Sequence, residues 1–234
     1  QAADLIALGR QDRIVCGGAQ EINWQSMCSF DGLGAFSRRV DDPEAASRPF
    51  DRDRDGLVPG GGAAALLLER YDLAQRRGAS ILAEIAGYGF SSDGESLSVP
   101  GRDGIARAMK SALADAGMVP GDVGYLCAHA TSTPLGDRME ARNIVSVMGE
   151  RSVPVSSTKS MTGHELWMSG ASQVVYTTLM ARDGFIAPNR NFSGPDEDSA
   201  LLDIVAEPRE ASITAALCNA AGFGGTNACI ALRF

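Results

Sequence analysis

The sequence predicts a layered α/β fold with a buried mixed sheet. The main observation is that strand patterns alternate with helix patterns along most of the second part of the chain, which is typical of helices packed on a sheet. In addition, three strand patterns follow one another before the C-terminus, which is typical of strands that pair in the same sheet. With 234 residues, of which 44% are hydrophobic and 21% charged, the chain can bury a sizeable core.

Residues 1–80 form the first predicted unit. Its patterns predict helices at residues 1–10, 21–30 and 73–78, and buried strands at residues 12–18 and 63–69. The helical pattern at the start has no capping residue in front of it, so we expect further residues to precede Gln1. The stretch 32–62 is rich in Gly, Pro, Asp and Arg, and a loop of this length predicts a functional or interface segment.

Residues 81–234 form the second predicted unit. Helices are predicted at 104–116, 137–148 and 164–181, and strands at 81–90, 123–129, 153–158, 202–206, 212–219 and 228–234.

Composition excludes several classes of function. The net charge of −8 disfavours nucleic acid as a main partner, because phosphate binding requires clustered Lys and Arg. No apolar run reaches the ~20 residues that a membrane span requires, and no signal peptide pattern opens the chain, so we expect a cytoplasmic protein. The five cysteines are scattered without any C-x-x-C pair, which predicts buried free thiols rather than a zinc site or disulfides.

The chain has two histidines, and both follow the end of a predicted strand. His129 ends the strand at 123–129, and His164 follows the strand at 153–158. Ligands of open α/β sheets bind beyond the carboxyl ends of the strands, so both positions favour a functional site. The alternative is two histidines with a purely structural role, and their matching positions beside Ser, Thr and Gly residues favour the site.

Two other features stand close to these strand ends. Lys159 precedes His164 by five residues, and a nearby positive charge keeps an imidazole neutral, so that one N–H can donate a hydrogen bond. The segment 219–227 contains three glycines, which let the backbone approach a ligand and offer N–H groups to a developing oxyanion. A surface lysine and a tight turn between strands are the respective alternatives.

These segments resemble the C-terminal signatures of the β-ketoacyl-acyl carrier protein synthases I and II. The matching segments, in the order found in that family, are HATSTPLGD at 129–137, TKSMTGH at 158–164 and NAAGFGGTN at 219–227. Two upstream segments, QDRIVCGGAQEINW and SRPFDRDRDGLVPGGGAA, resemble the region that precedes these signatures. The resemblance therefore covers essentially the whole chain.

The resemblance implies a thiolase-like layered α-β-α-β-α fold and a decarboxylative Claisen condensation. Residues 1–80 would be the remainder of the N-terminal half and residues 81–234 the C-terminal half. In such an enzyme, a cysteine thiolate accepts an acyl chain from acyl carrier protein. Malonyl carrier protein then loses carbon dioxide, and its carbanion attacks the thioester to give a 3-ketoacyl product for fatty acid or polyene/polyketide synthesis. No cofactor is expected beyond the phosphopantetheine that carries the substrates.

The resemblance also implies roles for four polar residues. His129 and His164 would polarise the malonyl thioester carbonyl and assist decarboxylation, a role that suits neutral imidazole N–H donors. Lys159 would support His164, and Glu140 would pair with Lys159.

Further residues are implied in substrate binding. Thr131 and Thr133 would hydrogen-bond the phosphopantetheine arm. Phe223 would be a gating residue whose backbone N–H belongs to the oxyanion hole, and Gly222 and Gly224 would bring the backbone close to the substrate.

The sequence departs from the family pattern in two respects. None of the five cysteines stands in the small-residue turn of the family's nucleophile, which we expect before Gln1, so this chain alone is not expected to form an acyl-enzyme. After His164 the family commonly has small residues, whereas Trp167 and Met168 stand here. We expect their bulk to alter chain preference, and ordinary core packing is the alternative.

Two other assignments stay open at this point. A non-catalytic chain-length factor, which pairs with a ketosynthase, usually lacks the nucleophile and often the histidines, so His129, His164 and Lys159 favour the enzyme. A thiolase shares the fold, but Cys218 and Cys229 do not stand in its C-x-G turn. Acyl carrier protein is the expected partner, together with either a second copy or a related ketosynthase subunit.

Overall fold

A six-stranded mixed sheet is the largest element of the computed structural model, which describes residues 1–94 and 96–234. Its strands are β3 (Glu84–Ser92), β4 (Tyr125–Cys127), β5 (Pro154–Ser156), β7 (Asp203–Ile204), β9 (Ala215–Gly222) and β10 (Thr226–Arg233). The order is β3-β10-β9-β4-β5-β7, in which β10 is antiparallel to both of its neighbours and β9, β4, β5 and β7 are parallel. The predicted mixed sheet is therefore confirmed.

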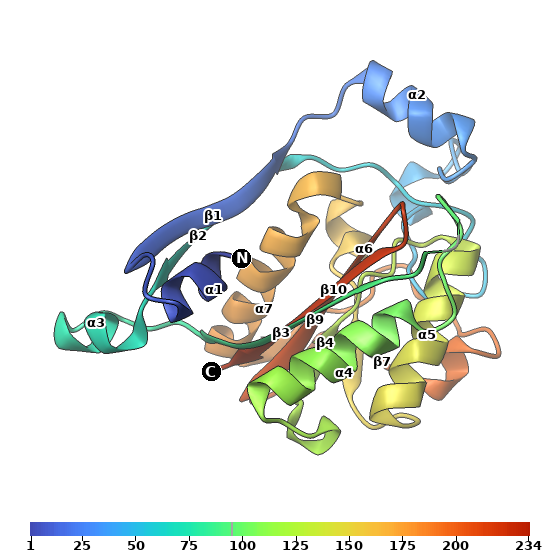
Figure 1. Cartoon of the computed structure of the whole chain (residues 1–234). Coiled ribbons are helices and arrows are strands. Elements are labelled where there is room, and N and C mark those ends of the chain that lie inside the picture. Colours follow the sequence, from blue (N-terminus) through green and yellow to red (C-terminus); the bar gives the residue numbers. More distant parts are fainter. Residues whose placement is uncertain (95) are drawn as a thin grey trace.

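Helices cover both faces of this sheet (Figure 1). The helices α4 (Gly104–Ala116) and α5 (Pro134–Met148) pack on one face, and α7 (Ser169–Asp183) packs on the other. Side chains of β4 alternate between the faces, as expected for a strand, because Leu126 belongs to the core under α4 and α5 whereas Tyr125 and Cys127 face α7. All three are fully buried, so the sheet is the centre of the core.

An antiparallel ribbon of two strands lies on the opposite side of α7 (Figure 1). It consists of β1 (Arg13–Gln20) and β2 (Gly62–Glu69), flanked by α1 (Ala2–Ala7) and α3 (Tyr71–Arg76). Since α7 contacts both the ribbon and the six-stranded sheet, the layers run ribbon, helix, sheet and helices. This order confirms the predicted layered α/β architecture.

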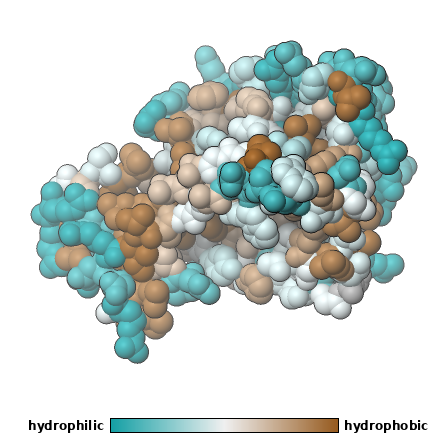
Figure 2. Space-filling model, turned by 90° about the horizontal axis from the view of Figure 1, so that it is seen from above, coloured by the Kyte–Doolittle hydropathy of each residue, from teal (hydrophilic) through white to brown (hydrophobic). Residues whose placement is uncertain are grey.

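The apolar sequence of the ribbon predicted buried strands, but the structure covers only one of its two faces. Val15 is 72% exposed and Leu67 is 60% exposed, whereas alternate residues of both strands face α7. Figure 2 shows hydrophobic residues gathered where this ribbon lies beside α3. The ribbon is therefore a strand pair with one covered face, and its sequence resembles that of a buried strand because small and apolar residues occupy the exposed face as well.

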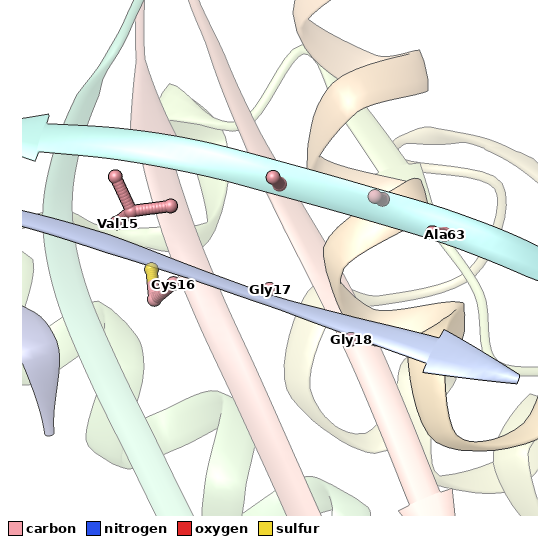
Figure 3. A pocket seen from close by; sticks show the side chains of 7 residues that line it. Val15, Cys16, Gly17, Gly18 and Ala63 are labelled. Atoms are coloured by element: carbon pink, nitrogen blue, oxygen red, sulfur yellow. The ribbon is translucent and has the colours of Figure 1, made fainter.

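A shallow groove of about 370 Å³ follows the ribbon. Figure 3 shows that Gly17, Gly18 and Ala63 leave it almost without projecting side chains. Among the described residues, Cys16 is the only one in its lining with a titratable side chain, and none of them also lines the cavity that contains the two histidines.

The long loop between the ribbon strands is ordered against the second part of the chain. It contains α2 (Trp24–Gly32), whose first turn is capped by the Asn23 side chain through the Ser26 N–H at 2.9 Å. Farther along, the fully buried Asp51 carboxylate accepts hydrogen bonds from the backbone N–H groups of Ser193 and Gly194. The loop is therefore attached to the second part of the chain, and its role as a functional or interface segment stays a prediction.

The predicted helix at 164–181 begins only at Ser169. A short helix α6 (Lys159–Thr162) ends at Gly163, which has φ 73°, and Leu166 has φ 47°. Positive φ values interrupt a right-handed helix, so His164 lies in an irregular turn between α6 and α7. A three-residue 3-10 segment, Leu166–Met168, leads into α7.

Two further short strands, β6 (Phe185–Ile186) and β8 (Arg209–Glu210), pair with each other beyond α7. Among the residues described, none of the helices combines the length and the apolar run needed to cross a bilayer.

The close packing of α4 on β3 predicts a large effect of one methyl group. A Cβ at Gly89 would overlap the backbone carbonyl of Ala108, whereas a Cβ at Gly170 in α7 would meet no atom within 4 Å. We expect Gly89→Ala to lower the free energy of unfolding by roughly 1–3 kcal/mol or more, because backbone atoms must move apart. Gly170→Ala should be neutral or stabilising by up to about 1 kcal/mol. Urea unfolding of both variants tests this, and equal effects would contradict the packing argument.

Candidate active site

The two histidines lie together on one wall of a cavity. Their ring centroids are 5.2 Å apart and the rings stand edge to face at 86°. His129 follows β4, and His164 lies in the turn before α7, so adjacent parallel strands deliver both rings to the same edge of the sheet. The cavity has a volume of about 680 Å³ and includes both residues in its lining.

The Glu140 carboxylate on α5 fixes the backbone around His129. One oxygen accepts the His129 N–H at 2.9 Å, and the other accepts the Ala130 N–H at 2.7 Å. The Asn219 side chain of β9 also donates to this carboxylate, at 3.1 Å. These bonds replace strand pairing, which explains why β4 ends before the predicted end of the strand at residue 129.

His164 is held by backbone and side-chain contacts. Its N–H donates to Val58 O at 2.7 Å, and its carbonyl accepts the Gly60 N–H at 2.8 Å. The Leu166 N–H donates to His164 Nδ1 at 3.3 Å. Because Nδ1 of the neutral ring acts as an acceptor, its hydrogen is on Nε2.

Lys159 is an unusual buried cation near both rings. Its side chain is 1% exposed, and Nζ has no hydrogen-bond partner among the described residues. Burial lowers the pKa of Lys159, while nearby Cys127, Glu140 and Glu165 oppose that effect by favouring the ammonium form. The lysine is therefore not the surface residue considered as the alternative.

Both imidazoles are neutral at ordinary pH. Burial lowers the pKa of His129 well below its usual value, and the charges of Lys159 and of a protonated His164 lower it further. Burial and Lys159 lower the pKa of His164 to about 3. Each ring can therefore donate one N–H without carrying a charge.

Glu140 and Lys159, which were expected to pair, interact electrostatically but not through a hydrogen bond between the described residues. The Glu140 oxygens bind N–H groups of His129, Ala130 and Asn219 rather than Lys159. The carboxylate and the ammonium still influence each other electrostatically, because Lys159 lowers the pKa of Glu140 against the larger rise that burial causes. Their interaction acts through space, without a direct hydrogen bond in the described part of the chain.

Two threonines stand beside His129 on the cavity wall. Thr131 and Thr133 both line the cavity, and their hydroxyl oxygens are 3.1 Å apart. The buried Asp137 carboxylate accepts the Thr131 N–H at 3.0 Å, and burial raises the pKa of Asp137 to about 7. The two hydroxyls thus sit on a fixed turn at the cavity edge.

The glycine-rich turn between β9 and β10 carries Phe223 at the cavity mouth. Gly222 and Phe223 line the cavity, whereas Gly224, with φ 86°, is outside the lining and donates its N–H to Leu97 O at 2.7 Å. The Phe223 ring is 45% exposed and stacks on Phe30 of α2, with centroids 5.7 Å apart.

Several residues around the cavity were not predicted from the sequence. Phe30 also stacks on Phe36, at 6.2 Å, and so forms an aromatic row that ends at Phe223. Gln173 of α7 donates to Ala128 O at 2.9 Å and to Asn219 O at 3.1 Å, which joins the residue after β4 to Asn219 within β9. The Phe30–Phe223 stack and the Gln173 hydrogen bonds have no local sequence signal, since they join residues far apart in the chain.

The two bulky residues after His164 have different surroundings. Trp167 is 79% exposed and lines the cavity. Met168 is 4% exposed, lies outside the cavity lining and packs against the ribbon at Gly18 and Gly62. Ordinary core packing therefore accounts for Met168, whereas Trp167 contributes to the shape of the cavity.

The arrangement favours stabilisation of a developing negative charge on a ligand oxygen. Two neutral imidazoles line a largely apolar cavity, and in such surroundings hydrogen bonds to a forming oxyanion are strong. Within residues 1–94 and 96–234, no three His, Cys, Asp or Glu side chains are grouped as metal ligands.

Comparison with known proteins gives a consistent assignment. Residues 1–74 match the family model for the beta-ketoacyl synthase N-terminal domain, and residues 82–193 match that for the beta-ketoacyl synthase C-terminal domain. The chain is 43% identical over 233 residues to 3-oxoacyl-[acyl-carrier-protein] synthase 1 of Escherichia coli K12. This match covers 99% of the chain and 57% of the relative, so the chain spans little more than half of the relative's length.

Solved structures of similar proteins have the same fold. A beta-ketoacyl synthase from Burkholderia phymatum STM815 matches with a TM-score of 0.97 and 41% identity, over 99% of this chain and 57% of that one. The ishigamide ketosynthase/chain length factor matches with a TM-score of 0.92 and 36% identity, over 99% of this chain and 56% of that one. The expected thiolase-like fold is thereby confirmed.

The buried charge of Lys159 predicts how the histidines titrate. Removing it in Lys159→Met should raise the pKa of His164 from about 3 towards its usual value, although burial continues to oppose protonation. The chain's other lysine, the exposed Lys110 on α4, provides a matched control in Lys110→Met, which should leave both histidines unchanged. Side-chain NMR of the two imidazoles as a function of pH measures this. Protonation of His164 near its ordinary pKa in the unmodified chain would contradict the assignment.

Proposed function

This chain belongs to the beta-ketoacyl synthase family, and on that premise we propose that it provides the decarboxylation site of a 3-oxoacyl-acyl carrier protein synthase. The reaction proposed is the decarboxylative Claisen condensation of malonyl carrier protein with an acyl thioester. The proposal rests on the pair of neutral imidazoles on the wall of the cavity, whose ring centroids are 5.2 Å apart.

His129 and His164 are proposed to act on the thioester carbonyl of the malonyl group. Their N–H groups donate to this oxygen while the bond between the α-carbon and the carboxylate breaks. The electron pair left by carbon dioxide then moves onto the oxygen as an enolate. Neutral donors stabilise this charge in an apolar cavity and do not pair with the substrate carboxylate as an imidazolium would. Lys159 serves as a positioning residue that keeps both rings neutral.

The remaining parts of the reaction are assigned to the cavity mouth. We propose that Thr131 and Thr133 hydrogen-bond the phosphopantetheine arm, because both hydroxyls stand beside His129 at the edge of the cavity. Phe223 is proposed to gate the acyl chain, with its backbone N–H donating to the oxyanion formed when the enolate attacks the thioester. Its stacking on Phe30 supports this role, since both rings line the cavity.

The thiolate that carries the acyl chain is proposed to come from outside these 234 residues. Cysteine is absent from the lining of the cavity in the described part of the chain. Cys127, Cys218 and Cys229 are buried in the core, while Cys16 lies on the ribbon and Cys28 is exposed on α2. We therefore propose that the 234-residue chain alone does not condense acyl groups.

A non-catalytic role is the second candidate, because a ketosynthase/chain length factor structure also matches this chain. The presence of both histidines on the cavity wall, with Lys159 buried near them, favours the catalytic role. For partners, we propose acyl carrier protein and either a second copy or a related ketosynthase subunit.

In a complete protein that contains these residues, loss of either histidine should impair decarboxylation without preventing formation of the acyl-enzyme. His129→Gln and His164→Gln should each slow release of carbon dioxide from malonyl carrier protein by about 100-fold or more, as expected for loss of an oxyanion donor. Formation of the acyl-enzyme, followed by intact mass, should persist in both variants. Unchanged decarboxylation would reject the role of the histidines, and absence of any acyl-enzyme in the unmodified protein would support the chain-length-factor role.

The exposure of Trp167 in the cavity predicts a change of acyl preference. Trp167→Gly should shift the product distribution towards longer or bulkier chains, because a large ring is removed from the cavity wall. The chain's other tryptophan, Trp24, is 74% exposed on α2 outside the cavity lining, so Trp24→Gly is the matched control. Mass spectrometry of the products measures the profile, and an identical profile in both variants would contradict the prediction.

A further inference from the structure

Glu165, which follows His164 directly, is a buried carboxylate that the proposed reaction does not use. Its side chain is 3% exposed and accepts hydrogen bonds from Ser172 Oγ at 2.6 Å and from Tyr176 OH at 2.9 Å. Both donors lie on α7, one turn apart. A buried carboxylate is costly without such partners, so this anchoring is a specific feature of the turn.

The backbone after Glu165 is strained. Leu166 has φ 47°, a left-handed conformation that a residue with a branched side chain rarely adopts, and Gly163 on the other side of His164 has φ 73°. Such strain persists only where the surrounding structure holds it in place. The strained position matters because its N–H is the donor to His164 Nδ1.

Two sets of contacts hold this turn from opposite sides. The segment Val58 to Gly60 holds the His164 backbone through two hydrogen bonds, of 2.7 and 2.8 Å. The Glu165 side chain attaches the next residue to α7. Leu166 follows directly, so the position of its N–H depends on both attachments.

We propose that Glu165 is a positioning residue that selects the tautomer of His164. By anchoring the turn to Ser172 and Tyr176, it keeps the Leu166 N–H at Nδ1 and so leaves the ring hydrogen on Nε2. The catalytic meaning of this tautomer rests on the proposed function, in which His164 donates to the substrate oxygen. The tautomer itself is a property of the chain that is measurable without any substrate.

Nitrogen-15 NMR of the imidazole side chains tests the proposal directly. The chain has only two histidines, and His129→Gln leaves a single pattern that belongs to His164. In the chain with Glu165 intact, we expect the neutral Nε2–H form. In Glu165→Ala, we expect the ratio of Nε2–H to Nδ1–H tautomers to fall by up to about tenfold, which corresponds to one lost hydrogen bond.

Three further variants separate the anchor from other effects. Ser172→Ala and Tyr176→Phe each remove one donor while the carboxylate stays, and each should give part of the Glu165→Ala change. Glu150→Ala is the matched control, because this exposed glutamate precedes β5 and should leave the His164 pattern unchanged. Circular dichroism identifies any variant that fails to fold, in which case the two single-donor variants decide the outcome.

The proposal is overturned if His164 keeps the single Nε2–H form in folded Glu165→Ala and in both single-donor variants. It is also overturned if Glu165→Ala changes only the pKa of the two histidines, since that result indicates a charge effect instead of an anchor. Neither outcome depends on condensation activity. A correct tautomer result combined with unchanged decarboxylation in His164→Gln would therefore reject the proposed function and leave the positioning role intact.

Discussion

The buried Glu140 carboxylate is the interaction on which the rest of the site depends. It joins α5 to the residues after β4 and to the interior of β9 by accepting N–H groups of His129, Ala130 and Asn219. Burial raises the pKa of this carboxyl group, and the three donors oppose that rise because they hydrogen-bond its charged form. Their geometry forces the chain out of strand pairing at His129, which places that ring in the cavity. Glu140 thus determines both the position of one histidine and part of the charge that balances Lys159.

The electrostatics of the site follow from burying a cation beside two bases. Lys159 lowers the pKa of both histidines, so their neutral forms are retained, but the ammonium itself loses hydration without gaining a hydrogen bond in the described structure. Glu140 and Glu165 partly offset this loss through space. A site of this kind sacrifices stability for a fixed protonation state, which is typical of residues whose pKa values serve a reaction.

Patterns local in sequence were predictable here, and contacts between distant segments were not. The helix at Gly104–Ala116 was predicted with both of its ends, because a single amphipathic pattern stops at Gly117 in the left-handed conformation. The helix expected from residue 164 begins at Ser169, since Glu165 and Leu166 take part in bonds that no local pattern encodes. The two histidines were recognised from their strand-end positions, whereas the Phe30 stack was not, because it joins residues nearly 200 positions apart in the chain.

Both parts of the chain line the cavity. The second part supplies most of its polar side chains, and the first part supplies apolar side chains of its wall. Residues after β4 and before α7 supply the histidines and threonines, which are fixed by buried hydrogen bonds to α5 and to the loop before β2. Phe30 and Leu33, by contrast, line the cavity from α2 and the residue after it, and α2 has no buried residue. Substitutions at such exposed wall positions change the space available to a ligand while the geometry of the imidazoles is retained. Under the proposed function, such substitutions would change the acyl chain that fits the cavity while the groups proposed to stabilise the enolate stay the same.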